Sequence, residues 1–235
     1  MTITYTSIFL PKPARKESLR LQYGFDCQCV KCKISETPPG STLNNIDNRL
    51  EGFDCPEENC GGLLIISTDD SATCDTCKTV HPRNLALIET FNKFFGICKT
   101  LSYDEQLEQI AALKQQAAEE KMHKFHSYLY QLQSFESKIR KERVLRLRQL
   151  EPSNPLEEDF RILLEKIKTV FNIAVIILPR NHPQRAHFLL DLGTVYCVNK
   201  QQQEGLKYFK LANKVLEISC GKKIAEQHLG KILRS

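Results

Sequence analysis

The stretch CPEENCGGLLIISTDDSATCDTC, residues 55–77, decides how the first half of this chain folds. It holds two pairs of cysteines, separated by an apolar run, Leu63 to Ser67, and by a polar turn at residues 68–71. A hairpin with one pair at each end can bring four thiolates around a single tetrahedral zinc ion. The stretch therefore predicts a zinc ribbon over residues 53–81. Its expected ligands are Cys55, Cys60, Cys74 and Cys77.

The first pair of this stretch has four residues between its cysteines, which is wider than the common spacing of two. His81 follows closely and is an alternative fourth ligand. With either set of ligands the protein fills every coordination position, so none is left for water or substrate. A zinc ion at this site would therefore be structural.

A second cysteine group precedes the ribbon in the motif CQCVKC, which contains Cys27, Cys29 and Cys32. Three thiolates so close in sequence can bind one zinc ion, but structural zinc prefers four ligands. We expect the fourth ligand to come from elsewhere in the fold; the alternative is three unligated cysteines in a loop. Seven of the chain's ten cysteines lie in these two groups, and in a reducing compartment clustered cysteines are more often metal ligands than disulfides.

The chain changes from β-favouring to helical sequence near Asn84, where apolar residues begin to recur three and four positions apart. The segment before the ribbon, residues 35–52, contains TPPGSTLNN and is predicted to be a loop. The first helix should bury the stripe Leu85, Ile88, Phe91, Phe95 and Cys98. The second should begin at a capping box formed by Ser102 and Glu105. Its buried face should consist of Leu107, Ile110, Ala111 and Ala118.

Four longer helices are expected after these two. One should run from Lys121 to Leu150 and end at the prolines of EPSNP, residues 151–155, which cannot continue a helical ladder. Its buried side should contain Met122, Phe125, Leu129 and Leu132. The other three are expected over residues 156–178, 181–199 and 203–219, and Gly221 should cap the last one.

The last two helices carry small and large residues at the positions of a tetratricopeptide repeat. The matching residues are Leu192, Gly193, Tyr196, Gly205, Phe209 and Ala212. Gly205 stands where alanine is usual, and Leu189 stands where tryptophan is usual. One repeat cannot bury its own apolar face, so neighbouring helices must cover it. The alternative is an ordinary helical hairpin with a small-residue contact.

Charge and hydropathy argue against several classes of function. The net charge is +5, and no apolar run approaches the roughly 20 residues of a membrane span. The N-terminus lacks the pattern of a secretory signal, so we expect a cytoplasmic or nuclear protein. A basic run on the long helix is interrupted by apolar residues, which favours a solvated face over a nucleic-acid site. The run contains Lys138, Arg140, Lys141, Arg143, Arg146 and Arg148.

Two stretches of this chain resemble the SET-MYND family of protein-lysine methyltransferases. TITY, residues 2–5, resembles the strand that ends the SET domain. RLQYGFDCQCVKC, residues 20–32, resembles the family's post-SET motif R-x-x-L-x-x-x-Y-x-F-x-C-x-C-x-x-C, with the arginine nearer than usual. A zinc ribbon after the post-SET cysteines and a helical, tetratricopeptide-like C-terminal domain are similar to the longer, more divergent branch of that family.

The resemblance implies a role for each matching residue. Tyr5 and Tyr23 would line the lysine channel as catalytic residues, and Phe25 would pack against S-adenosylmethionine. Cys27, Cys29 and Cys32 would hold a post-SET zinc ion, completed by a cysteine of the family's N-H-x-C motif. The printed sequence lacks that motif, the G-x-G cofactor loop and the MYND finger. We therefore expect the C-terminal part of a methyltransferase, inactive by itself.

The expected fold class is mainly α: a tetratricopeptide-like helical array preceded by a small zinc-bound post-SET segment and a zinc ribbon. The expected divisions are residues 1–34 for the end of the SET domain with the post-SET segment, 35–52 for the loop, 53–81 for the ribbon and 84–235 for the helical domain. Expected cofactors are zinc and S-adenosylmethionine. Expected partners are a substrate lysine in a histone or non-histone protein, and proteins bound by the helical repeats, but neither membranes nor nucleic acid. The alternative function is a non-catalytic adaptor that binds protein partners.

Overall fold

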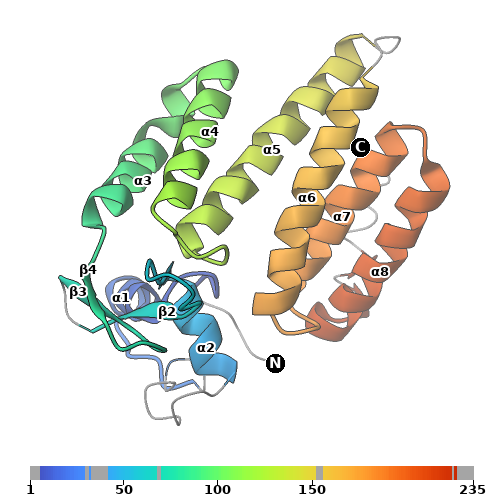
Figure 1. The fold of residues 1–235 in the computed structure, drawn as a ribbon. Coiled ribbons are helices and arrows are strands. Elements are labelled where there is room, and N and C mark those ends of the chain that lie inside the picture. Colours follow the sequence, from blue (N-terminus) through green and yellow to red (C-terminus); the bar gives the residue numbers. More distant parts are fainter. Residues whose placement is uncertain are drawn as a thin grey trace. The chain divides into compact units, whose positions relative to one another are not determined.

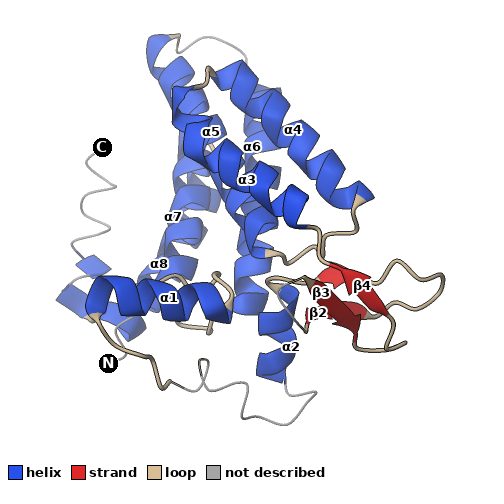
Figure 2. Ribbon diagram, turned by 90° about the vertical axis from the view of Figure 1, so that its left-hand side faces the viewer, coloured by secondary structure: helices blue, strands red, loops and turns tan. Residues whose placement is uncertain are grey.

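The computed structural model describes residues 6–29, 32, 42–67, 70–151, 156–223 and 225–226. This part of the chain is mainly helical and contains one small sheet (Figures 1 and 2), which confirms the predicted fold class. The chain packs as two compact units, Thr2–Leu132 and Gln133–Ser235, called here the N-terminal unit and the C-terminal unit. That division falls within a helix, and the predicted domain limits stay a prediction. No helix of the described residues is long and apolar enough to cross a membrane.

An antiparallel sheet of four strands forms the ribbon in the N-terminal unit (Figure 1). In spatial order the strands are β1 (Phe53–Asp54), β2 (Leu63–Ile66), β3 (Ser71–Cys74) and β4 (Val80–Pro82). The outer side of β1 is bonded to the segment at residues 121–123, because the amide of Asp54 donates to the carbonyl of Lys121 over 2.7 Å. The predicted strand at Leu63 is confirmed, and the ribbon is attached to the helical sequence that follows it.

In the described part of the chain two helices precede the sheet, and neither was predicted from the sequence. α1 (Lys12–Tyr23) has Pro13 in its first turn, where a helix has no intrahelical partner for an amide. α2 (Thr42–Arg49) lies where a loop was predicted, so that prediction is wrong. The reason is tertiary, because Arg15 and Asp47 form a buried ion pair of 2.7 Å between the two helices.

The next helix, α3 (Leu85–Ile97), begins at Asn84, whose side-chain oxygen accepts the amide of Leu87 over 3.0 Å. Its buried stripe is Leu87, Phe91 and Phe94, continued by Cys98 in a short 3₁₀ turn, η2 (Cys98–Thr100). The predicted stripe is wrong by part of a turn, since Leu85 is exposed. Both stripes have helical spacing, and only packing within the unit selects between them.

α4 (Tyr103–Glu119) confirms the predicted capping box. The amide of Glu105 donates to the hydroxyl of Ser102 over 3.3 Å, and the carboxylate of Glu105 accepts the amide of Ser102 over 2.7 Å. The buried face consists of Ile110, Leu113 and Ala117. Ala111 and Ala118 are exposed, so that part of the prediction is wrong. The longer side chain of Leu113 buries more apolar area than either alanine would, which favours the observed face.

α5 (Ser127–Leu150) begins later than the predicted start at Lys121. Lys121 has a left-handed backbone with φ of 53°, and Met122 forms an isolated bridge with Phe53. These residues complete the edge of the sheet, so they cannot also belong to the helix. The helix ends at Leu150, directly before the EPSNP segment, as predicted.

The C-terminal unit contains the rest of α5 and three further helices, α6 (Glu157–Ile177), α7 (Pro183–Val198) and α8 (Gln202–Cys220). All three lie where helices were predicted, with ends that differ by at most two residues. Gly221 follows α8 with φ of 90°, in agreement with its predicted role as a cap. One core cluster of this unit consists of Val144, Leu156, Phe160, Leu163, Ile167, Leu192 and Val195.

Two glycines set the close approach of α7 to α8. A Cβ atom on Gly193 would lie 2.5 Å from the ring of Phe209. A Cβ atom on Gly205 would lie 2.3 Å from the sulfur of Cys197 and 2.7 Å from the carbonyl oxygen of Gly193. The two helices therefore meet more closely than any side chain at these positions would allow. This agrees with the predicted small-residue contact, while the tetratricopeptide assignment itself stays a prediction.

A buried histidine lies in the N-terminal unit directly before α5. His126 is 2% exposed, and its ring packs edge-on against Phe53 with centroids 5.5 Å apart. Its Nδ1 atom accepts the amide of Tyr128 over 3.2 Å. Burial, with a smaller contribution from the nearby His123, lowers the pKa of His126 to about 3. The ring is therefore neutral in the folded protein.

We expect His126 to make the N-terminal unit lose stability in acid. In the unfolded chain this histidine takes up a proton below about pH 6.5, which the folded state resists, so stability is lost as the pH falls from that value toward the folded pKa. Between pH 7 and pH 5 the loss should amount to about 2 kcal/mol. Urea unfolding at both pH values measures it. The variant His126→Asn offers an acceptor to the Tyr128 amide but does not titrate, so its loss of stability between the two pH values should be smaller than that of the wild type by about 2 kcal/mol. An equal loss of stability in both proteins would contradict the prediction.

Candidate metal centres

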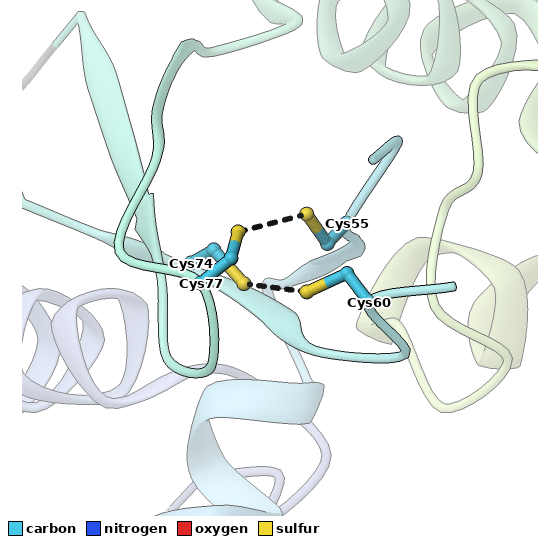
Figure 3. A group of neighbouring side chains, drawn as sticks. All are labelled: Cys55, Cys60, Cys74 and Cys77. Atoms are coloured by element: carbon cyan, nitrogen blue, oxygen red, sulfur yellow. Dashed lines mark hydrogen bonds between the residues drawn. The ribbon is translucent and has the colours of Figure 1, made fainter. Parts of the chain in front are cut away.

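The four cysteines of the ribbon converge at one end of the sheet (Figure 3). Cys55 follows β1, Cys60 precedes β2, Cys74 ends β3, and Cys77 lies in the turn before β4. The sulfur atoms of Cys55 and Cys77 are 3.7 Å apart, and those of Cys60 and Cys74 are 3.5 Å apart. All four sulfur atoms lie within 4.8 Å of one another. The predicted ligands are thus brought together by the hairpin that the sequence suggested.

This arrangement fits a tetrahedral metal ion. Zinc–sulfur bonds of about 2.3 Å place the sulfur atoms of a tetrahedral site about 3.8 Å apart. The backbone is adapted to the sulfur atoms as well, since the amide of Thr76 donates to the sulfur of Cys74 over 3.4 Å. A Cβ atom on Gly62 would lie 2.5 Å from the same sulfur, so only glycine leaves room for it. The four-cysteine group could therefore hold a zinc ion.

The protein environment shifts the pKa values of two of these thiols in opposite directions. Hydrogen bonding with the side chain and the backbone of Thr79 lowers the pKa of Cys77 to about 6. Burial raises the pKa of Cys55 to about 12. A thiolate at Cys55 consequently needs a cation beside it, and a metal ion supplies that charge.

His81, the alternative ligand, lies outside the four-cysteine group. Its Nε2 atom is 3.6 Å from a carboxylate oxygen of Glu57. Among the described residues the cysteine sulfurs alone make up the cluster, so the geometry favours the four-cysteine set over one that includes His81.

The cysteines of the CQCVKC motif form a second cluster, in which the sulfur atoms of Cys27, Cys29 and Cys32 also lie within 4.8 Å of one another. Cys32 is 4% exposed, and burial raises the pKa of its thiol to about 11. Within the described ranges, no fourth histidine, cysteine or carboxylate joins this group. The described residues therefore supply three ligands, and the source of the fourth stays a prediction.

α1 positions the residues that precede this cluster. The helix ends at Gly24, which has φ of 70° and whose amide donates to the carbonyl of Arg20 over 3.0 Å. Tyr23 and Phe25 stand on either side of that glycine, with ring centroids 6.5 Å apart. Their exposed fractions are 50% and 38%. Two of the three aromatic residues implied by the resemblance are therefore neighbours at the surface, and the third, Tyr5, lies outside the described residues.

An ion pair that was not predicted from the sequence holds α1 against α2. Arg15 is 3% exposed, and it donates to Asp47 and to the carbonyl of Leu10. Charged residues are rarely buried unless they are paired, so this contact anchors the helix that carries Tyr23. Pro13 could have indicated the start of α1 in the sequence. Nothing near Arg15 in the sequence indicated that its partner is Asp47.

The basic run on α5 is partly occupied by contacts within the C-terminal unit. Arg140 pairs with Glu136 at 3.0 Å, Lys141 pairs with Asp191, and Arg148 lies over the ring of Phe160. Three of the six basic residues of the run are therefore held by contacts within the unit, and the solvated face stays a prediction.

Comparison with known proteins shows what this chain is similar to. No family model matches the chain. Histone-lysine N-methyltransferase ASHR1 of Arabidopsis thaliana is 25% identical over 224 residues, which cover 94% of this chain and 44% of that protein. Two SET and MYND domain-containing proteins of Dictyostelium discoideum also match. One is 28% identical over 105 residues, which cover 40% of this chain and 25% of that protein. The other is 30% identical over 64 residues, which cover 27% of this chain and 16% of that protein.

One of these relatives is named as a histone-lysine methyltransferase, and the other two are named for SET and MYND domains. At the level of the family, this chain is similar to SET-MYND proteins, in agreement with the resemblance of its CQCVKC segment. The chain spans less than half the length of each of these relatives.

Proposed function

We propose that this chain is part of an S-adenosylmethionine-dependent protein-lysine N-methyltransferase, in which it supplies one wall of the lysine channel and a domain that binds partner proteins. The observation that carries the proposal is the similarity over 94% of the chain to a protein named as a histone-lysine methyltransferase. The aromatic pair beside the three-cysteine cluster supports it, because both rings are exposed next to a group that could hold zinc.

The exposed rings suit the chemistry of lysine methylation. S-adenosylmethionine, when bound, supplies the methyl group to an unprotonated lysine amine. An aromatic wall at Tyr23 would pack against the alkyl stem and remove water from the ammonium group, which favours loss of its proton. The ring of Phe25 offers an apolar face for the cofactor. A zinc ion at Cys27, Cys29 and Cys32 would hold this short segment rigid.

Binding and turnover test the proposal separately in the intact protein. Phe25→Ala should weaken binding of S-adenosylmethionine by about 1 kcal/mol or more, because an aromatic contact is lost, and calorimetry measures this. Tyr5→Phe removes a hydroxyl that would orient the amine, so it should lower kcat on a lysine-peptide array much more than it changes cofactor affinity. Tyr103→Phe, at the start of α4, is the matched control and should change neither.

Two further outcomes test different parts of this proposal. The printed sequence lacks the family's G-x-G and N-H-x-C motifs, so the 235-residue chain should show no turnover, and robust turnover would overturn that expectation. Failure of the intact protein to bind S-adenosylmethionine would favour the non-catalytic adaptor instead.

A further inference from the structure

A cavity of about 430 Å³ lies within the N-terminal unit, and no cysteine lines it. One wall is the sheet, with Phe53, Leu64 and Ile66, and another is the start of α3, with Ile88. Glu51 lines the cavity as well. The volume of the cavity lies in the range typical of sites that bind a ligand, and the walls of the cavity are largely apolar.

Acidic groups predominate around this cavity. The carboxylates that line it belong to Glu51, Asp54, Glu119 and Glu120, and the cations are Arg83 and Lys121. Lys121 donates to the backbone carbonyl of Pro56 over 3.2 Å rather than to a carboxylate. Four carboxylates against two cations leave a formal charge of −2 when all are ionised, which attracts a cationic ligand.

Glu51 is the carboxylate that most needs a partner. It is half-buried, and no hydrogen bond or ion pair within the described part of the chain reaches its carboxyl group. Burial, with a smaller contribution from Asp47, raises its pKa to about 7, although Arg83 and Arg15 act in the opposite direction. A cation that entered the cavity would stabilise the ionised form of Glu51 and form a charge-assisted hydrogen bond with it.

An edge strand stands beside the cavity. His81 and Pro82 of β4 line it, and among the described strands β4 pairs with β3 alone. Val80 of the same strand is 62% exposed. An exposed strand edge can pair with an extended peptide while a neighbouring pocket takes one of the peptide's side chains. This geometry suits a peptide better than a small free amine.

We propose that the cavity binds an extended peptide segment through one basic side chain. The ammonium or guanidinium group pairs with Glu51, and the aliphatic stem packs against Phe53, Leu64 and Ile88. Such a side chain combines an apolar stem with a charged end, which matches the apolar walls and the unpaired carboxylate. The site is separate from Tyr23 and Phe25 in sequence, and it does not rest on methyl transfer.

Fluorescence polarisation with the zinc-loaded 235-residue chain tests this binding. The probes are labelled heptapeptides of alanine with a central lysine, arginine or norleucine. The lysine or the arginine peptide should bind at least tenfold more tightly than the norleucine peptide, because only a cation can pair with Glu51. Glu51→Gln should remove that tenfold preference, whereas Glu108→Gln, an exposed carboxylate on α4, should retain it. Ile88→Trp, which fills the cavity, should abolish binding of all three peptides.

Equal binding of the norleucine and basic peptides, or an unchanged preference in Glu51→Gln, would overturn the proposal. If spermidine competed as strongly as the unlabelled basic peptide, the occupant of the cavity would be a small polyamine. That result would also overturn the proposal. Circular dichroism shows whether each variant is folded. If Glu51→Gln is not folded, Ile88→Trp provides an independent test of the cavity. No cofactor is present in this assay, so its failure would leave the proposed methyltransferase function untouched.

Discussion

Replacing Cys74 with serine should release the ribbon zinc and unfold the sheet at residues 53–82. Cys74 is fully buried, and its sulfur lies 3.5 Å from that of Cys60 in the four-cysteine group. In small zinc modules the metal contributes about 10–16 kcal/mol, and a sheet of such short strands has little core of its own. Metal analysis should show one zinc fewer per chain. Hydrogen exchange should show loss of amide protection in β2 and β3, with α7 and α8 unchanged.

Cys220→Ser is the matched control for this experiment. Cys220 is half-buried and lies outside both cysteine groups, so the substitution should leave the zinc content unchanged. Zinc content in Cys74→Ser equal to that of the wild type would refute the four-cysteine site. Wild-type protein purified under reducing conditions without any zinc would do the same.

Replacing Gly205 with valine should destabilise the C-terminal unit by about 3 kcal/mol, because overpacking a tight contact forces the backbone apart. A side chain at this position meets the sulfur of Cys197 and the carbonyl oxygen of Gly193, and the carbonyl cannot rotate away. Urea unfolding followed by helical circular dichroism measures the loss. The smaller change Gly205→Ala should be partly rescued by Cys197→Ala, which removes the sulfur but leaves the carbonyl contact.

Gly96→Ala controls for the general effect of replacing a glycine within a helix. Gly96 is exposed on α3, and no atom would lie within 4 Å of its added Cβ, so alanine should be neutral or stabilise by up to about 1 kcal/mol. If Gly205→Val unfolded at the same urea concentration as the wild type, the close contact between α7 and α8 would not exist as described.

Local sequence determined the helices of the C-terminal unit and the cysteine clusters. Proline removes a backbone donor, so EPSNP and Pro179 end α5 and α6 independently of tertiary contacts. Thiolates are distinctive ligands, and their spacing along a hairpin restricts where they can meet, so both cysteine groups could be predicted. The capping box of α4 was predictable because it is a local contact between two residues, Ser102 and Glu105, that lie three positions apart in the sequence.

Tertiary structure alone decided the other elements. α2 became a helix through the buried pair of Arg15 and Asp47, which come from different helices. The face of α3 and the late start of α5 depend on contacts with segments far away in the sequence, including the bridge between Phe53 and Met122. The cavity at Glu51 could not be predicted either, because its walls come from β strands, α3 and the end of α4. Periodicity reports which residues are apolar, but the choice of buried face depends on which partner surface the folded chain presents.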